Sequence, residues 1–470
     1  MKKLWLPALA LALLVFTVSP AQQSGQTLSY LFTPDLPHDF IAPIPGATGF
    51  QGAANAMSWQ SFVAVNWPAA PGKFGVPDRN NFLGGFPKGG YLPGGLPIGP
   101  TVWETWKAPA DVFLNPPRKP DPWDTPQTIP PQCKQLVAAN GVANGPGAIK
   151  ILTMRTKVSQ FLDSDDQAFA GPLNDQNGKR VWYEVRMNEA AFNYIVEHKF
   201  YDSNNQKGAT IRFPHSSNDG TGIGAMFVKA AWKQIDPVKD AWLIPRIYTR
   251  LSYIMDPISK QCTAQTVGLV GLHIIHKTAT RPQWVWSTFE QIDNAPTEGT
   301  TPPSGAHFSF NNPASNEIPN QQPTKTNPYK PVQVARVVPI DAVAAGLTSQ
   351  YQATMREVLP DHKTPWQFYE LVNTQWPAAP KDPAIPFGGP QPTYLANAVL
   401  ETYFQDPVTP NPITPANPPH SCMACHGHFA PSTDFDFQLH KACPAAQWCK
   451  QGPLLTEPRV RIPEANRLEK

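Results

Sequence analysis

The sequence predicts an α+β fold whose core is an antiparallel β-sheet, accompanied by a few helices and long proline-rich loops. Three apolar segments, at residues 224–235, 266–278 and 282–292, have the alternation and the aromatic content of strands. The 56 prolines among 470 residues favour ordered loops and turns over a helical bundle. The 14 tryptophans and 24 phenylalanines supply enough apolar volume for a core, so a globally disordered chain is not expected.

The N-terminus has the pattern of a secretory signal peptide. Lys2 and Lys3 precede an almost wholly apolar stretch, and small residues suited to cleavage follow, ending at Ala21. No later apolar stretch is long enough to cross a bilayer. We therefore expect residues 1–21 to be removed, and the mature chain to be periplasmic or secreted without a membrane span. The formal net charge of +3, with no dense basic run, gives no reason to expect nucleic acid as a partner.

Residues 22–150 are predicted to form a Pro/Gly-rich N-terminal extension, and residues 151–300 an α/β sheet unit. Short amphipathic helices are expected in the extension, around residues 59–67 and 102–114. In the sheet unit, Asn188 should cap a helix ahead of the three strands. The second and third strands should form an antiparallel pair through a short proline-containing turn.

Residues 301–404 are predicted to hold an insertion and helices. The stretch up to residue 335 is rich in Pro, Asn and Thr and has no regular pattern, which is typical of a surface loop. Asp341 is a natural cap for the first of the helices that follow. A proline-rich connector begins at residue 405. The helices are expected at 341–358, 365–375 and 394–404.

The strongest functional signal is the C-x-x-C-H motif formed by Cys422, Cys425 and His426. Two cysteines three positions apart can each add to one vinyl group of a haem, and the adjacent histidine can bind the iron. One covalent haem c is therefore predicted on Cys422 and Cys425, with His426 as the proximal axial ligand. Export agrees with this, because c-type haem is attached outside the bacterial cytoplasm. Residues 405–470 are accordingly interpreted as a connector and a c-type haem segment.

Other interpretations of the motif fit less well. A thioredoxin-like redox pair should follow a strand, whereas this one follows a proline-rich connector. A zinc site needs four converging ligands, and the motif with the nearby His428 is too crowded to surround one ion. A structural disulfide would leave His426 without a role.

Four further cysteines suit an oxidising compartment. Cys443 and Cys449 are close enough in sequence for a local bridge, which would leave Cys133 with Cys262. Sequence alone does not fix this connectivity.

The distal position on the iron has more than one interpretation. No methionine follows His426, so the Met/His ligation of small electron-transfer cytochromes is not expected from that side. His428 is too close to the proximal ligand to reach the opposite face of the haem. His440 or His273 could supply a distal ligand, or the position is open. For both histidines an ordinary surface or core role is the alternative.

Strand alternation assigns faces to the candidate residues of the sheet. It puts Val267, Leu269 and His273 on one face of the second strand. Glu290 or Asp293 could then pair with this histidine. Trp284 and Trp286, on the third strand, are core residues or the wall of a haem pocket.

The same landmarks resemble the cytochrome P-460 and cytochrome c′-beta family, over residues 180–295 and 394–440. In that family C-x-x-C-H lies near the C-terminus and is followed by an Asp-x-x-Phe element. The matching residues upstream and downstream are Phe213, Asp219-Gly220-Thr221, Val228-Lys229 and Asp434-Phe435-Asp436-Phe437.

The resemblance implies a largely antiparallel β protein with a His-ligated haem and an open distal site. Some members oxidise hydroxylamine or nitric oxide, and others only bind nitric oxide. A strand lysine is cross-linked to the haem in the oxidising members, which implies a catalytic role for Lys229. From the residues alone, Lys229 is more simply a strand-edge lysine that reaches solvent, because a buried ammonium is costly unless it is paired or faces a cavity. The N-terminal extension and the insertion depart from the family pattern.

The sequence is compatible with three functions. The first is a five-coordinate haem protein that binds, or carries out redox chemistry on, a small ligand such as a nitrogen oxide, hydroxylamine or a peroxide-like species. It would be a haem-dependent oxidoreductase that exchanges electrons with a redox partner protein. The second is a six-coordinate electron-transfer cytochrome. The third is a binding module that the haem merely stabilises.

Overall fold

The computed structural model describes residues 31–41, 49–80, 91–92, 96–97, 100–142, 145–153, 172–255, 261–324, 326–358, 364–380, 389–405 and 421–444. The predicted signal peptide, the connector after residue 405 and Cys449 lie outside these ranges. No helix within them is long and apolar enough to cross a membrane.

The fold is α+β, as predicted, and its sheet is mostly antiparallel. The strands are β1 Tyr91–Leu92, β2 Leu96–Pro97, β3 Lys150–Thr153, β4 Trp182–Met187, β5 Met226–Gln234, β6 Thr249–Met255, β7 Cys262–His276, β8 Val285–Gln291, β9 Tyr369–Pro377 and β10 Pro390–Gln391. The α-helices are α1 Gly49–Val65, α2 Pro109–Val112, α3 Pro131–Ala139, α4 Glu189–Glu197, α5 Ser203–Gln206, α6 Ala342–Val358 and α7 Cys422–Phe429. Short 3-10 helices are η3 Trp103–Thr105, η4 Ile244–Arg246, η5 Pro365–Phe368, η6 Thr402–Phe404, η7 Pro431–Thr433 and η8 Gln438–Lys441.

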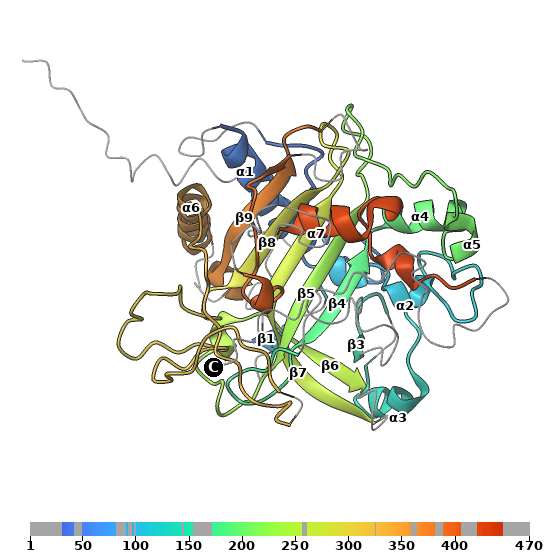
Figure 1. Cartoon of the computed structure of the whole chain (residues 1–470). Helices are drawn as coiled ribbons and strands as arrows, with labels where there is room; N and C mark the ends of the chain where they lie inside the picture. Colours follow the sequence, from blue (N-terminus) through green and yellow to red (C-terminus); the bar gives the residue numbers. More distant parts are fainter. Residues whose placement is uncertain are drawn as a thin grey trace, which may run out of the picture.

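An eight-stranded sheet forms the centre of the molecule (Figure 1). Its main path runs β10-β9-β8-β7-β5-β4, and β6 joins the first half of β7 to β3. The predicted pairing of β7 with β8 is confirmed. Between the strands of this sheet, the β3–β6 pair alone is parallel. The long central strand β7 therefore pairs with three other strands, β5, β6 and β8.

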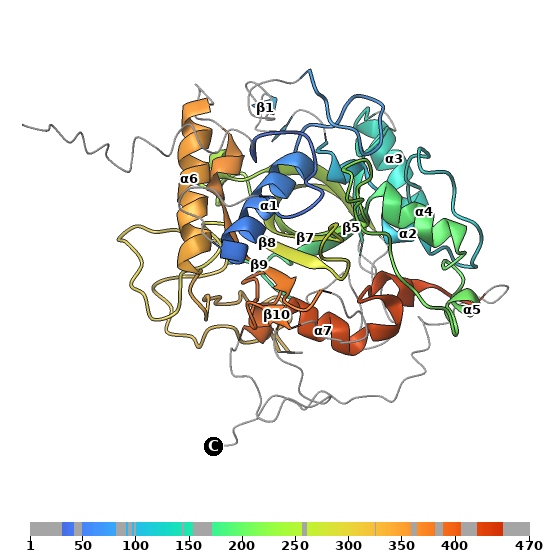
Figure 2. The ribbon, with the colours of Figure 1, turned by 90° about the horizontal axis from the view of Figure 1, so that it is seen from above.

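The two faces of the sheet are covered by different helices. Helices α1 and α6 lie on one face, called here the α1 face, and α7 lies on the other, the α7 face (Figure 2). The α1 face buries an aromatic cluster in which the Trp59 and Tyr351 rings stack with centroids 3.7 Å apart. On the α7 face, Phe227 and Trp286 pack with Met423 of α7. Apolar burial on both faces is what holds the layers together.

A β-bulge in β7 makes one sequence prediction wrong. Trp232 of β5 pairs with Leu269, but the preceding Ala231 pairs with Gly271, so one residue of β7 is left unpaired between them. The extra residue reverses the alternation of faces. Val267 and Leu269 therefore face the α1 cluster, whereas His273, one residue from the α1-face Leu272, points to the α7 face.

Helix predictions succeeded where a cap defined the start. The Asn188 side chain accepts a hydrogen bond from the Ala191 backbone at 3.1 Å and begins α4, and Asp341 caps α6 in the same way. The helix expected around residues 59–67 is the end of the longer α1.

Three helix predictions do not match the structure. Residues 102–114 form η3 and then α2, with an extended break at Trp106, because Pro109 has no N–H and begins a new helix. Residues 365–375 become η5 and strand β9. Residues 394–404 form turns and η6.

The Cys133–Cys262 disulfide is present and ties α3 to the start of β7. Cys443 is also disulfide-bonded. Its predicted partner lies outside the described ranges. A disulfide is consistent with the predicted export.

Candidate haem-attachment site

The C-x-x-C-H motif forms most of helix α7. The helix begins there because the Ser421 hydroxyl accepts a hydrogen bond from the Ala424 backbone at 3.3 Å. The Gln375 side chain of β9 accepts a hydrogen bond from the Met423 backbone at 2.8 Å and fixes the helix to the sheet. Burial of the Met423 side chain among the aromatic residues of the α7 face adds to this docking.

The imidazole of His426 is held through one nitrogen. Its Nδ1 lies 2.7 Å from the carbonyl oxygen of Phe435, and because a carbonyl can only accept, Nδ1 carries the proton. No described residue forms a hydrogen bond with Nε2 of this ring. The ring lies between Trp286 and Phe437, with centroids 4.3 and 4.5 Å away. Burial lowers the pKa of His426 to about 3, so the imidazole is neutral and able to bind a metal at ordinary pH.

Both thiols of the motif are free and partly exposed. The loss of surrounding water that comes with their partial burial raises the pKa of Cys425 to about 12 and that of Cys422 well above its usual range, and the negative charge of Glu401 adds to both shifts. Redox-active cysteines normally have a lowered pKa. The raised pKa values of Cys422 and Cys425 therefore do not favour a thioredoxin-like redox pair.

A group of polar side chains lies on the α7 face of the sheet, near His426. Lys229 of β5 pairs across the strands with His273 of β7. The Nε2 atom of His273 lies 2.8 Å from Oε1 of Glu401, and the other carboxylate oxygen accepts a hydrogen bond from the Asn397 backbone at 2.9 Å. The charges of Lys229, His273 and Glu401 all influence the pKa of His426, which agrees with their shared position on the α7 face.

Lys229 is half-buried, and its ammonium lies 5.5 Å from the centre of the Tyr183 ring. It is therefore not simply a strand lysine in solvent. Burial opposes the ionisation of Glu401, but His273 and Lys229 outweigh it and hold the pKa of that carboxyl below its usual value. Lys229 thus lies within electrostatic reach of the His273–Glu401 pair.

Sequence reasoning missed Glu401 and suggested two other partners for His273. Glu290 is instead paired with Arg336 at 2.8 Å, and Asp293 with Arg246 at 2.7 Å. The signal that could have identified Glu401 was its position one turn after Asn397, whose side chain binds the sheet. The helix predicted over residues 394–404 includes this position.

His440 lies in η8 and contacts the turn that follows α7. Its Nε2 is 3.5 Å from the Thr433 hydroxyl, within the turn that also provides the Phe435 carbonyl. That turn contacts His426 at Nδ1, whereas iron would be bound at Nε2. The prediction of His440 as a distal ligand gains no support from this position.

The residues present fit a c-type haem. They provide two free thiols, an imidazole fixed through Nδ1 and aromatic side chains around it. The indole N–H of Trp286, beside His426, is buried and without a hydrogen-bond partner in the described part of the chain, which leaves it free to donate to a bound group. Over the same residues, no three His, Cys, Asp or Glu side chains converge to hold a bare metal ion.

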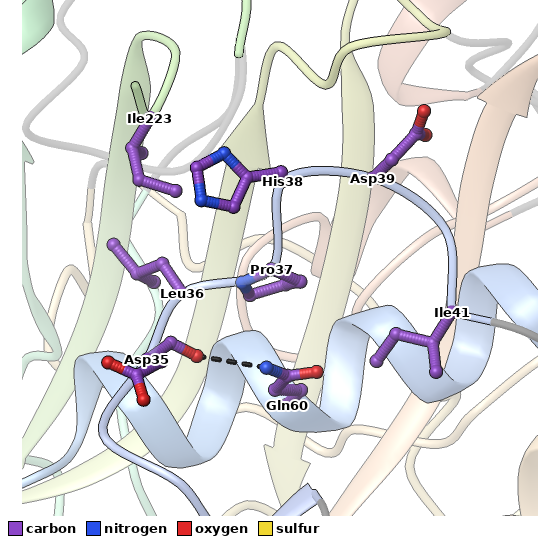
Figure 3. Close-up of a pocket in the computed structure, with 8 residues that line it drawn as sticks. All are labelled: Asp35, Leu36, Pro37, His38, Asp39, Ile41, Gln60 and Ile223. Carbon is purple, nitrogen blue, oxygen red and sulfur yellow. Dashed lines mark hydrogen bonds between the residues drawn. The ribbon is translucent and has the colours of Figure 1, made fainter. Parts of the chain in front are cut away.

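A separate cavity of about 510 Å³ lies beside α1 (Figure 3). It is lined by residues 35–39, Ile41, Gln60 and Ile223, and none of the predicted site residues reaches it. The His38 ring bonds the Gly222 carbonyl, and Gln60 bonds that of Asp35, so its polar groups are largely satisfied by the protein itself.

The fold and the site together define an α+β protein with a C-terminal C-x-x-C-H helix docked on one face of its sheet. In comparisons with protein-family models, with curated proteins and with solved structures, nothing matches this chain. The resemblance to the cytochrome P-460 and cytochrome c′-beta family therefore stays a prediction.

Proposed function

We propose that this chain is an exported c-type cytochrome, in which Cys422 and Cys425 bind one haem covalently and His426 is the proximal ligand. The observation that carries the proposal is the 2.7 Å bond from His426 Nδ1 to the Phe435 carbonyl. Metal-binding histidines characteristically donate their other N–H to a carbonyl or carboxylate, which fixes the tautomer and orients the ring. The free thiols of Cys422, one turn earlier on the same helix, and of Cys425, directly before His426, support it.

We further propose that the distal position is open and that the iron is five-coordinate. The Nε2 atom of His273 is already bonded to Glu401, which argues against ligation by that nitrogen. His440 lies in η8, with its Nε2 directed to the Thr433 hydroxyl of the turn that contacts His426 through Nδ1. Each observation favours small-ligand chemistry over a six-coordinate electron carrier.

The ligand we propose is small and polar: a nitrogen oxide, hydroxylamine or a peroxide-like species. The haem supplies a redox-active iron to which such a ligand can bind. Ligands of this class gain or lose protons with electrons, so a site for them needs a group that exchanges protons. The His273–Glu401 pair is suited to that role, and the cationic Lys229 beside it can orient a polar ligand. Electrons would pass to or from a redox partner protein.

The test is to express the full chain with a c-type maturation system and to record absorption spectra of both oxidation states, with and without carbon monoxide. Covalent haem with a high-spin spectrum that shifts with carbon monoxide is the expected result. Cys422→Ala and Cys425→Ala should each weaken covalent attachment, and the double variant should abolish it. Cys133→Ala with Cys262→Ala is the matched control, since it removes two cysteines without affecting attachment.

Two outcomes would overturn parts of the proposal. A low-spin spectrum that does not change with carbon monoxide would mean that both axial positions are filled. Electron transfer would then replace small-ligand chemistry as the proposed function. Wild-type protein without covalent haem would overturn the proposed function as a whole.

A further inference from the structure

Two consecutive residues behind the proximal histidine adopt left-handed backbone conformations. Asp434 has φ 55° and Phe435 has φ 67°. Non-glycine residues, and bulky aromatic ones above all, rarely adopt this region, and surrounding structure must hold them there. The carbonyl of Phe435, which accepts a hydrogen bond from Nδ1–H of His426, is therefore positioned by the contacts that fix this turn.

Three contacts from other parts of the chain fix it at Asp434. The ammonium of Lys277, just after β7, forms a buried ion pair with the Asp434 carboxylate. The same carboxylate accepts a hydrogen bond from the Phe213 backbone at 2.8 Å. The indole of Trp284 donates to the Asp434 carbonyl at 2.7 Å.

The residues that contact Asp434 also contact one another. Lys277 also donates to the Phe213 carbonyl at 3.2 Å, and its ammonium lies 5.2 Å from the centre of the Trp284 ring. Asp434 and Lys277 are 3% and 2% exposed, so neither charge is solvated by water. A buried pair of this kind is seldom worth more to stability than apolar side chains of the same volume. The ion pair and its hydrogen bonds instead hold the turn in one position.

We infer that Lys277, Asp434 and Trp284 form a clamp that positions the Phe435 carbonyl against Nδ1 of His426 and so sets the properties of the iron. They are positioning residues, and the inference rests on the proposed function. A strong bond at Nδ1 makes the imidazole a more basic ligand, which favours the oxidised iron. Loosening the clamp weakens that bond and raises the reduction potential.

The test is a redox titration of the haem-loaded full chain. Asp434→Asn keeps an acceptor for the Phe213 N–H but loses its charge, and Trp284→Phe removes the indole donor. Both variants should retain covalent haem and show a higher potential than wild type. Should Asp434→Asn fail to fold, the double variant with Lys277→Met removes both buried charges and should show the same rise.

The control is Lys233→Met. Lys233 is 1% exposed and pairs with Asp175 and Asp240, each at 2.7 Å, so it is an equally buried ion pair in another part of the fold. This control should lose thermal stability and keep the wild-type potential. The clamp would be refuted by haem-loaded clamp variants that keep the wild-type reduction potential, or by a shift in potential that the control shares. Either result would leave the proposed function intact. Absence of covalent haem from wild type would overturn the proposed function itself, and the clamp with it.

Discussion

His273 and Glu401 lie 2.8 Å apart although 128 positions separate them in the sequence. The side-chain amide of Asn397 donates to the Thr288 hydroxyl at 2.8 Å and to the Phe289 carbonyl at 3.0 Å, so the segment that carries Glu401 is fixed to β8. The bulge in β7 turns His273 towards the same segment. The bulge and the hydrogen bonds of Asn397 together bring His273 and Glu401 within hydrogen-bond distance.

Replacing Glu401 by Gln should weaken this pair without breaking the fold. A hydrogen bond to a charged group contributes about 1.5–3 kcal/mol, so the free energy of unfolding should fall by about 1–3 kcal/mol. In the haem-loaded protein, the rate of nitric oxide or carbon monoxide binding should also change, since Glu401 orients His273. Urea unfolding and flash photolysis measure the two effects.

The exposed Glu298 offers a matched control, because Glu298→Gln makes the same chemical change at the surface. It should leave both stability and ligand binding as in wild type. Equal behaviour of the two glutamine variants would contradict a role for Glu401.

The strands could be predicted because the alternation of apolar and polar residues is a local pattern. The face of the sheet to which each side chain points could not be predicted. Alternation puts Val267 and His273 on one side, and the single unpaired residue of β7 reverses this. A bulge is set by packing between strands, which the sequence of one strand does not contain. Its signal was the pair Gly268 and Gly271, at positions where an added Cβ would collide with neighbouring side chains.

The attachment motif could be predicted from spacing, whereas its supporting residues could not. Cys422, Cys425 and His426 lie within five consecutive residues, so their chemistry can be predicted without knowledge of the fold. Glu401 and Lys277 acquire their positions from long-range contacts with His273 and Asp434. The helix predicted over 394–404 failed because the Asn397 side chain bonds to the sheet and to its own turn.

Gly271→Ala should disturb the same pair from the strand side. A Cβ at this position would lie 2.7 Å from a methyl of Val399 and 3.4 Å from the Asn397 side chain. Overpacking of this kind costs about 1–3 kcal/mol, and the displaced segment should alter ligand binding as Glu401→Gln does. Thermal unfolding and flash photolysis of the haem-loaded protein measure both.

The control for Gly271 is Gly346, an exposed glycine within α6 where a Cβ meets nothing within 4 Å. Gly346→Ala should raise the free energy of unfolding by about 0.5–1 kcal/mol, because alanine is the better helix former. A stabilising effect of Gly271→Ala would refute the close packing of the 397–400 segment on β7.

His276 should make the protein sensitive to acid. It is 1% exposed, its Nε2 lies 3.0 Å from the Ser216 hydroxyl, and burial lowers its pKa from 6.5 to about 3. The unfolded chain therefore binds the proton more tightly than the folded one. Stability is fully present above pH 6.5 and falls as the pH drops towards 3, by on the order of 4 kcal/mol for this group.

Urea unfolding of wild type and of His276→Gln across that range measures the contribution. The variant should show a shallower loss of stability on acidification, because it lacks the buried group that must take up a proton. The exposed His198, changed in the same way, should keep the wild-type slope. Parallel pH profiles for wild type and His276→Gln would count against this assignment.

The Cys133–Cys262 disulfide should be the largest single covalent contribution to stability among the described residues. It closes a loop of 129 residues between α3 and the start of β7. In the chain-entropy view, a loop of this length restricts the unfolded ensemble by about 4–5 kcal/mol. The double variant Cys133→Ala with Cys262→Ala should therefore have a free energy of unfolding in urea about 3–5 kcal/mol lower than wild type, with a similar dependence on denaturant concentration.

The control for this prediction is a reductant. Because Cys443 is also disulfide-bonded, a reductant acts on more than one bridge, and its effect on the double variant gives the contribution of the remaining bridge. A reductant that lowers the stability of wild type and of the double variant by the same amount would show that the Cys133–Cys262 bond contributes nothing.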